Sequence, residues 1–482
     1  MNRRVVIDPV TRVEGHGKVT LLLDEADHIT EARLHIVEFR GFEKFIQGRP
    51  YWELPLVVQR LCGICPVSHH LAAAKAIDQI VGVNQLTAGA FALRKLMHFA
   101  QVLQSHALHF FHLAAPDLLF GFDSDIAKRN IVSLIQNHQT LALHGVRIRK
   151  FGQQIIEAVS GKRIHGIAAI PGGMNAPLTA DKIQPFKNDV ADIISWCEET
   201  VSTIKTLFLS NRPYHEPFGT SASSFMALVG EQDRLELYDG VIKVVDKQGR
   251  EIKRQSCDNY HELLKEQVKS WSYMKFPYLA DMTPATGWYR VGPLARMNVC
   301  HHIDTPRAEN CRQDFVSTLG TPVHSPLAYH WARMIEALHC AEAIQQLLDD
   351  PMLLSDDLVT EGAKQKQGIG IIEAPRGTLI HHYQINDHDQ VTMANLIVST
   401  TNNNQAMNES IRQVANQHLD GKELTPELLN LVEVVIRAYD PCLSCATHAA
   451  GKMPLQLELQ DANGAMLGTL QRDSDGSLHY AD

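Results

Sequence analysis

Apolar residues change their spacing along the chain from an alternating pattern to a helical one. Residues 4–40 alternate apolar and polar positions around turn signals such as Glu14-Gly15-His16-Gly17, which predicts a small set of antiparallel strands. From residue 54 to about residue 210, apolar residues recur every three to four positions in segments too long for strands. Helices are therefore predicted at 87–111, 124–159 and 181–209.

The second half of the chain mixes strand and helix patterns. Residues 238–253 predict a β-hairpin with its turn near Lys247-Gln248-Gly249. Further helices are predicted at 325–348, 404–418 and 426–439, and strands at 368–373, 378–384, 391–398 and twice within 455–480. No internal repeat and no Pro- or Ser-rich linker divides the chain. We therefore expect an α+β, mostly helical fold with long central helices and peripheral β-hairpins, including N-terminal β-elements in about residues 1–45.

The composition is that of a globular chain with a large core. The 482 residues are 45% hydrophobic and 21% charged, which allows one large domain or two to three smaller ones. The net charge is −9 with Lys and Arg interspersed, which argues against nucleic acid and anionic membranes as partners. No apolar run reaches roughly eighteen residues, and no export signal is visible. We therefore expect no direct membrane insertion and a cytoplasmic location.

Two Cys-x-x-Cys pairs carry the strongest chemical signal. Cys62 and Cys65 lie near the N-terminal end of the chain, and Cys442 and Cys445 lie near its C-terminal end. The spacing lets both sulfurs of a pair face one ion, and four thiolates are soft ligands that suit zinc, iron–sulfur clusters, or nickel and iron. Pro66 suits the first position of a helix, which would put Cys65 at the positive end and favour its thiolate.

The pairs have simpler interpretations than a catalytic centre. One alternative is a structural zinc site with four cysteine ligands. A disulfide or thioredoxin-like pair fits less well, because two pairs occur and neither lies in an obvious βαβ unit. The pairs are 377 residues apart (442 − 65), so joining them would place the site in the centre of the fold, where a catalytic role is more common. The scattered cysteines are predicted to be buried apolar residues: Cys197, Cys257, Cys300, Cys311 and Cys340.

Both pairs lie in longer stretches that resemble the signatures of nickel–iron hydrogenase large subunits. These stretches are RLCGICPVSH at 60–69 and DPCLSCATH at 440–448. Other family markers are matched, in family order, by DPVTRVEGH at 8–16, RGFE at 40–43 and EAPRG at 373–377. Within the family, the chain is most similar to the large subunit of the soluble, NAD-coupled bidirectional hydrogenases, in the stretches at 37–50, 271–278 and 438–449.

The resemblance implies that the four cysteines hold one nickel and one iron. Cys62 and Cys442 would be terminal ligands of the nickel. Cys65 and Cys445 would bridge the nickel to an iron that also carries carbonyl and cyanide ligands. The resemblance therefore implies the nickel–iron hydrogenase large-subunit fold, with both ends of the chain meeting at one metal centre.

The resemblance also places other side chains around that centre. Glu43 and His448 would help to bind a magnesium ion, and Arg376 would lie over the diatomic ligands with its guanidinium near the open metal position. Some uptake hydrogenases carry an aspartate beside a histidine in the helix over the site, whereas this chain has Ser105-His106. Asp440 is therefore the expected carboxylate neighbour of Arg376.

Heterolytic cleavage of dihydrogen requires a Lewis-acidic metal for the hydride and a base for the proton. The thiolate of Cys442 or Arg376 would be the base. Glu14 is the candidate gate for the departing proton, because a carboxyl group can rotate between partners; the alternative is a surface turn glutamate. His69 is predicted to donate a hydrogen bond to the sulfur of Cys65, and the alternative is an ordinary core histidine.

Electrons must leave through other polypeptides. The chain has no glycine-rich dinucleotide fingerprint in a βαβ context and no further cysteine cluster suited to an iron–sulfur relay. The resemblance implies a heteromultimer in which an iron–sulfur small subunit joins diaphorase subunits that carry FMN and bind NAD. The alternatives are coupling to an NADP or deazaflavin module, a zinc-stapled structural subunit, and a relative of the quinone-reductase subunit, which lacks the cysteine pairs.

The resemblance finally predicts proteolytic maturation. After nickel-insertion proteins load the site, a maturation endopeptidase would cut after His448 and release residues 449–482. Residues 1–448 would then form a single catalytic domain. The expected physical role of the uncut tail is to hold Cys442 and Cys445 away from the first pair while metal is inserted.

Overall fold

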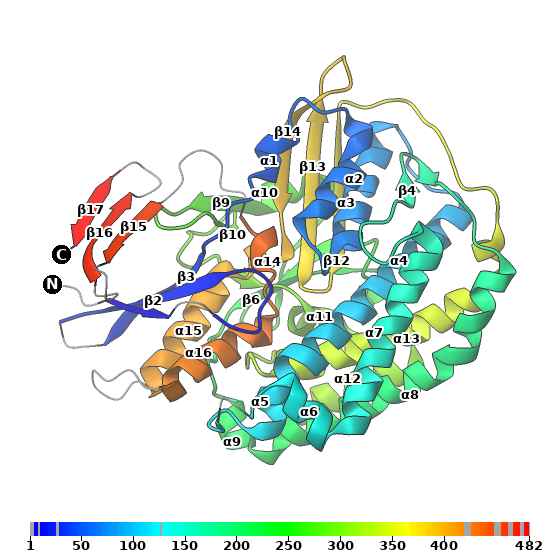
Figure 1. Cartoon of the computed structure of the whole chain (residues 1–482). Helices are drawn as coiled ribbons and strands as arrows, with labels where there is room; N and C mark the ends of the chain where they lie inside the picture. Colours follow the sequence, from blue (N-terminus) through cyan, green and yellow to red (C-terminus); the bar gives the residue numbers. More distant parts are fainter. Residues whose placement is uncertain are drawn as a thin grey trace.

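The computed structural model describes residues 4–7, 10–25, 28–125, 128–418, 426–447, 455–460, 466–472 and 477–481. Long helices occupy one side of the molecule, and small sheets gather around them (Figure 1). This arrangement confirms the predicted α+β, mostly helical fold with peripheral β-hairpins.

The long helices form one packed layer. Its central helix is α13 (Ala328–Asp349), which packs against α4 (Ala88–Ala107) and α8 (Ala180–Ser210) and is buried on nearly every side. The helix α7 (Gln139–Ser160) also packs on α4 (Figure 1). These helices confirm the apolar periodicity predicted from the sequence. No described helix combines the length and the apolar composition needed to cross a membrane.

Two helical segments depart from the predicted pattern. The helix predicted at 124–159 is divided, because Asn130 caps a separate short helix α6 (Ile131–Asn137) by accepting a hydrogen bond from the backbone N–H of Ser133. α4 continues as a π-helical segment, η3 (Leu108–Ala114), before α5 (Ala115–Phe120). Such π-helical turns are rare and often occur near functional sites.

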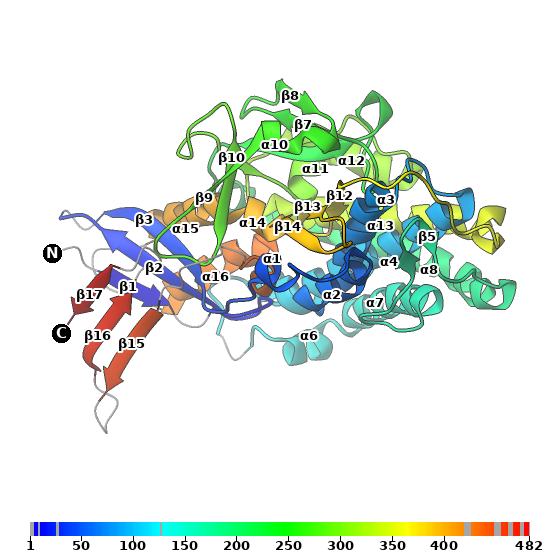
Figure 2. The ribbon, with the colours of Figure 1, turned by 90° about the horizontal axis from the view of Figure 1, so that it is seen from above.

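A three-stranded antiparallel sheet carries the next layer, in the order β12-β13-β14. Its strands confirm the predicted ones: β12 (Gln367–Ala374), β13 (Gly377–Ile385) and β14 (Val391–Ile397). The helix α3 (Pro66–Ile80) lies on this sheet (Figures 1 and 2). A Cβ atom on Gly370 would lie 2.0 Å from the backbone oxygen of Ala72, so glycine is required for this close approach.

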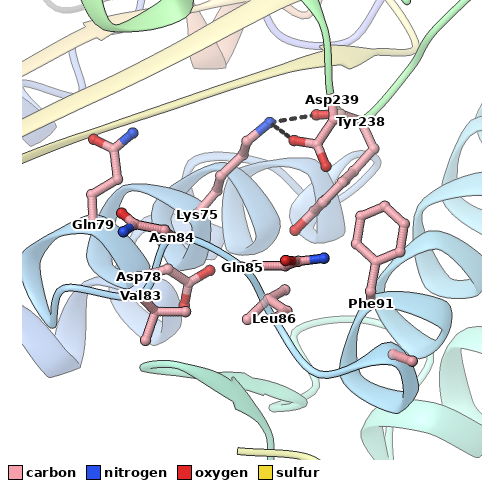
Figure 3. A pocket seen from close by; sticks show the side chains of 11 residues that line it. Lys75, Asp78, Gln79, Val83, Asn84, Gln85, Leu86, Phe91, Tyr238 and Asp239 are labelled. Carbon is pink, nitrogen blue, oxygen red and sulfur yellow. Dashed lines mark hydrogen bonds and ion pairs between the residues drawn. The ribbon is translucent and has the colours of Figure 1, made fainter. Parts of the chain in front are cut away.

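Lys75 ties α3 to the strands beside it. Its Nζ donates to the backbone oxygens of Tyr238 at 2.6 Å and Ile371 at 3.1 Å, and it forms an ion pair with Asp239. Figure 3 shows this amine pointing at residues 238 and 239 across a pocket of about 430 Å³. Lys75 is thus committed to fixing α3, whose N-terminal end carries the first cysteine pair.

The N-terminal sheet and the predicted hairpin are both present. β1 (Arg4–Ile7), β2 (Gly17–Leu23) and β3 (Ile29–Ile36) form an antiparallel sheet that packs on α15 (Asn404–His418). The hairpin predicted at 238–253 belongs to a four-stranded sheet of order β11-β6-β7-β8, made of β6 (Ser224–Val229), β7 (Val241–Val245), β8 (Glu251–Gln255) and β11 (Tyr289–Arg290). Shorter elements are α1 (Phe42–Phe45), α2 (Leu54–Val57), α9 (Arg212–His215), α10 (Tyr260–Leu263), α11 (Pro293–Val299), α12 (Pro306–Leu319), α14 (Ser399–Asn402), β4 (Ala169–Ile170), β5 (Gly173–Met174), β9 (Leu264–Val268) and β10 (Lys275–Leu279).

The C-terminal tail forms a sheet of its own. The strands β15 (Leu455–Gln460), β16 (Met466–Arg472) and β17 (Leu478–Ala481) are antiparallel and neighbours in that order. The prediction of two strands here is wrong, because the last residues pair with β16 as a third strand. In Figure 1 this sheet lies beside the N-terminal sheet, away from the long helices.

Candidate metal centre

Cys62 and Cys65 lie at the N-terminal end of α3. Pro66 is the first residue of that helix and Cys65 is its N-cap, as the sequence predicts. The Sγ atom of Cys62 accepts hydrogen bonds from the backbone N–H groups of Ile64 and Cys65, each at 3.2 Å. The backbone therefore folds around the first sulfur, and the positive end of the helix faces the site.

Cys442 and Cys445 lie in a turn after α16 (Pro426–Tyr439). Two distant segments hold this turn. The backbone N–H of Cys442 donates to Oγ1 of Thr400 at 2.9 Å, and the N–H of Leu443 donates to the backbone oxygen of Glu14 at 3.0 Å. The second pair is therefore fixed by α14 and by the loop between β1 and β2.

All four sulfurs meet in one buried cluster. The Sγ atoms of Cys62, Cys65, Cys442 and Cys445 lie within 4.8 Å of one another. The Sγ of Cys442 is 3.3 Å from that of Cys62 and 2.8 Å from that of Cys445. Within the described ranges, no other group of three or more potential metal-binding side chains is found. The structure thus assembles the ligand set that the sequence predicts.

This cluster contradicts the role expected for the tail. The cysteine pairs are together although β15, β16 and β17 are present in the chain. The expectation that an uncut tail holds Cys442 and Cys445 away from the first pair is therefore wrong for this structure. The reason is that both cysteines have contacts with residues that precede the tail: Cys442 with Thr400 and Glu14, and Cys445 with the backbone oxygen of Leu61.

The electrostatics of the cluster fit a bound cation. Burial raises the pKa values of the Cys442 and Cys445 thiols well above their usual range. Hydrogen bonds from Cys442, Cys445 and Cys62, followed by one from His69, lower the pKa of Cys65. Four thiolates this close together repel one another, so a positively charged metal is needed to hold them all deprotonated. The donor set and its burial therefore suit a soft-bound metal pair.

Arg376 lies at the two-residue turn between β12 and β13. Its Nε donates to the backbone oxygen of Asp440 at 2.7 Å and its Nη2 to Oδ1 of Asp440 at 3.0 Å, so the expected contact is present. The buried atoms Nη1 of Arg376 and Oδ2 of Asp440 have no hydrogen-bond partner among the described residues. A buried unpaired donor is costly, so Nη1 indicates a place for a polar bound group.

A buried arginine clamps the chain just before Arg376. Arg296 binds Glu336 through Nε and Nη2 and binds Glu373 through Nη1 at 2.6 Å. The same guanidinium donates to the backbone oxygens of residues 374 and 375, at 3.2 and 3.3 Å. Burial disfavours the Glu336 carboxylate, but Arg296 outweighs it and lowers the pKa of Glu336 to about 2. His106 joins this network through its Nε2, which lies 2.6 Å from Oε2 of Glu336.

Glu14 reaches the cluster from the loop between β1 and β2. Its Oε2 accepts hydrogen bonds from Sγ of Cys442 at 3.0 Å and from the backbone N–H of Ser444 at 3.2 Å. The hydroxyl of Ser444 donates to Oε1. Glu14 is half-buried, so it links the cluster to the outside of the core. The alternative of a surface turn glutamate is therefore wrong.

The remaining predicted site residues have different outcomes. His69 is buried and is among the hydrogen-bond partners that lower the pKa of Cys65. Glu43 is buried and accepts hydrogen bonds at Oε1 from Nζ of Lys275 at 2.7 Å and from the backbone N–H of Leu396 at 2.9 Å. His448 lies outside the described residues.

Several site residues carry no sequence motif. Arg296, Glu336 and Thr400 lie in segments whose spacing resembles ordinary core helix or loop. His381 and Tyr383 could have been paired with each other, because alternate residues of a strand share one face, but nothing in that pattern points to His69. Arg376 and Asp440, by contrast, lie within the EAPRG and DPCLSCATH motifs and were predicted from them.

Comparison with known proteins identifies the family. A model described as nickel-dependent hydrogenase matches residues 40–121 and 228–448, and a HoxL-like model matches residues 4–39. This chain belongs to the nickel-dependent hydrogenase family. It is a nickel–iron hydrogenase large subunit, an enzyme whose paired cysteine motifs bind nickel and iron.

Relatives resemble this hydrogenase subunit over nearly its whole length. It is 44% identical to NAD-reducing hydrogenase HoxS subunit beta of Cupriavidus necator, over 97% of this chain and 99% of the relative. It is 39% identical to one subunit of the F420-non-reducing hydrogenase vhc of Methanococcus voltae, over 96% of this chain and 99% of the relative.

Solved structures show the same fold. The crystal structure of an NAD+-reducing NiFe hydrogenase in the H2-reduced state matches with a TM-score of 0.90 and 54% identity, over 92% of this chain and 99% of the other. The nickel–iron hydrogenase large-subunit fold expected from the sequence is therefore confirmed. The alternatives of a zinc-stapled scaffold and a quinone-reductase relative are set aside, because the hydrogenase cysteine pairs are present and assembled.

The Arg296 clamp gives the first prediction. Replacing Arg296 by Met leaves the Glu336 and Glu373 carboxylates buried without their cation, so we expect a loss of about 3–5 kcal/mol in the free energy of unfolding. Arg254→Met is the control, because Arg254 also binds two carboxylates but is 40% exposed. The control should change stability by about 1 kcal/mol or less. Equal shifts of the two denaturation midpoints would contradict the buried clamp.

Proposed function

We propose that this hydrogenase large subunit cleaves and forms dihydrogen for an NAD-reducing complex. The observation that carries the proposal is the buried cluster of four sulfurs beside the guanidinium of Arg376, whose Nη1 has no hydrogen-bond partner among the residues described. The relative named for NAD reduction and the NAD+-reducing crystal structure support the acceptor. A complex that reduces NAD works where NAD is held, which favours the cytoplasm. The alternative is coupling to NADP or a deazaflavin, and identifying the partner subunits distinguishes it from coupling to NAD.

The proposed chemistry assigns a base and a proton route to this chain. When bound, the nickel–iron pair supplies the Lewis acidity that polarises dihydrogen. Burial disfavours the charge of Arg376, but Asp440 and the cysteine sulfurs outweigh it and raise the pKa of Arg376 above its usual value. Arg376 therefore keeps its proton, and the Sγ of Cys442 is the better base. A proton there lies 3.0 Å from Oε2 of Glu14, which can carry it outward.

The other proposed ligand roles follow the same geometry. Cys62 and Cys442 are assigned as terminal nickel ligands, and Cys65 and Cys445 as bridging ligands. The unpaired Nη1 of Arg376 supports an iron with carbonyl and cyanide ligands at that position.

We assign Glu43 and His448 to a magnesium ion. Both contacts of the Glu43 carboxylate, with Lys275 and Leu396, are made by Oε1, so Oε2 is the atom proposed for the cation. Burial raises the pKa of Glu43, which a nearby cation would oppose. Oxygen ligands suit magnesium, as this carboxylate does.

We also propose the surface through which electrons leave. Nε2 of His165 donates to the backbone oxygen of Cys62 at 2.9 Å, and Nδ1 of His165 lies 3.1 Å from Nη1 of Arg60. This pair reaches the surface between the exposed residues Ile164 and Ile167. The segments α2, α6 and α7 lie on the lower side of the molecule in Figure 2. We call Arg60, Ile164, His165 and Ile167 the exit face, and we assign it to the iron–sulfur small subunit, which joins the diaphorase subunits.

Glu14→Gln tests the proton route. The amide keeps the size of the side chain but cannot take up a proton, so dye-linked hydrogen oxidation should fall by about 10²-fold. Nickel content should be unchanged. Glu53→Gln is the control, because Glu53 is a surface residue paired with Arg49. A wild-type rate in the Glu14 variant would remove it from the route.

Intact mass tests the proposed maturation. Active protein that contains nickel should end at His448, with residues 449–482 removed by an endopeptidase after nickel-insertion proteins have acted. Protein from cells grown without nickel should keep the tail. Active enzyme that retains all 482 residues would contradict both the cut and the single catalytic domain of residues 1–448.

The exit face is tested by charge substitution. Ile164→Asp with Ile167→Asp places two carboxylates in the proposed interface, so the tagged subunit should no longer co-purify with an iron–sulfur and FMN-containing partner. Val268→Asp is the control, because Val268 is exposed on β9 outside the exit face. Nickel content should persist in all variants. Retention of the partner by the double variant would place the interface elsewhere.

A further inference from the structure

A buried chain of three side chains ends at the metal centre. Nδ1 of His69 lies 3.2 Å from Nε2 of His381, and Nδ1 of His381 lies 2.6 Å from the hydroxyl of Tyr383. His381 and Tyr383 are 0% exposed and His69 is 1% exposed. His69 lies on α3 four residues after Cys65, the N-cap of that helix, and its side chain is among the partners that lower the pKa of the Cys65 thiol. The chain therefore runs from a strand of the sheet, through α3, to one of the metal-binding sulfurs.

The strand geometry explains why these residues meet. His381 and Tyr383 are two positions apart on β13, so both side chains point to the face covered by α3. His382 points to the other face, where its Nδ1 lies 3.0 Å from the hydroxyl of Tyr260. One strand thus carries two tyrosine–histidine contacts, but only the one on the α3 side reaches the metal centre.

The direction of the hydrogen bonds follows from the donors available. Burial raises the pKa of Tyr383 well above its usual value, so the phenol keeps its proton. With His381 as its partner, the phenol donates to Nδ1, which places the His381 proton on Nε2. The Nε2–H of His381 donates to Nδ1 of His69. Nδ1 of His69 therefore carries no proton, and the proton of His69 lies on its Nε2, which is the nitrogen that can donate to the sulfur of Cys65. If the chain ran in the opposite direction, His69 would have no proton to donate to the sulfur.

We propose that Tyr383 and His381 are positioning residues that fix the tautomer of His69 and so maintain its hydrogen bond to the sulfur of Cys65. The inference rests on the proposed role of Cys65 as a bridging ligand. A hydrogen bond to a thiolate withdraws electron density from it, and such outer contacts tune a bound metal. Tyr383 and His381 thus influence the electron density at the metal centre through His69, without touching a metal-binding sulfur themselves.

Tyr383→Phe is the direct test. It keeps the ring in the core but removes the hydroxyl that donates to Nδ1 of His381, so His69 can adopt the other tautomer. The sulfur of Cys65 then donates more electron density to the metals. We expect the midpoint potential of the nickel electron paramagnetic resonance signal to fall, and the carbonyl infrared band to move to lower wavenumber.

Tyr260→Phe is the matched control. It removes the same hydroxyl from a histidine contact on the opposite face of the same strand, and it should leave both spectroscopic signals at their wild-type positions. A second test repeats Tyr383→Phe in a His69→Gln protein. If Tyr383 acts through His69, the effects of the two substitutions must not be additive. In that background, Tyr383→Phe should add no further shift.

Two results would overturn the inference. One is a Tyr383→Phe protein with wild-type nickel content and unshifted signals. The other is an equal shift in the presence and absence of His69. If Tyr383→Phe lowers the nickel content, the two spectroscopic signals are measured on the fraction of that variant that still holds nickel, and on His381→Phe. Wild-type signal positions in the nickel-loaded fraction would count against the proposal. Wild-type protein without nickel would instead defeat the proposed function, so the two failures are distinct.

Discussion

The contact between the sulfurs of Cys62 and Cys442 is the constraint on which the rest of the structure depends. These residues are 380 positions apart, and their sulfurs are 3.3 Å apart in a buried cluster. To bring them together, the N-terminal end of α3 must face the turn that follows α16. The close packing of α3 on β12, the loop that carries Glu14 and the contact from Thr400 all serve that meeting. A metal pair supplies the positive charge that four crowded thiolates require.

Charged groups around the cluster are buried in pairs, which makes the site rigid. Arg376 is held by Asp440 on one side, and its turn is held by Arg296 on the other. Each buried charge would be costly alone, so each is matched by a partner. Within the part of the chain that the structure describes, Nη1 of Arg376 and Oδ2 of Asp440 are left without a hydrogen-bond partner, which a bound polar group would supply. Fixed donors of this kind stabilise charge without reorganising during a reaction.

The sequence predicted the site in the places where neighbouring residues form a motif. Both cysteine pairs, the arginine of EAPRG and the aspartate before Cys442 were found because the chain keeps them adjacent. Arg296, His381 and Tyr383 were missed, because their roles arise only when distant segments pack together. Most long helices followed their apolar spacing, whereas the break at Asn130 depended on a single cap and the π-helical segment on tertiary packing. The tail was misjudged, because the contacts that fix Cys442 are made by residues far from it.

The central claim is that four sulfurs from both ends of this chain hold a nickel-containing centre. X-ray absorption at the nickel edge of purified, processed protein tests it most directly. The account predicts a nickel environment dominated by sulfur, with a neighbouring iron, and loss of bound nickel when Cys62 or Cys442 is replaced by Ser. Nickel bound mainly to nitrogen and oxygen, or zinc in place of nickel in catalytically active protein, would contradict it.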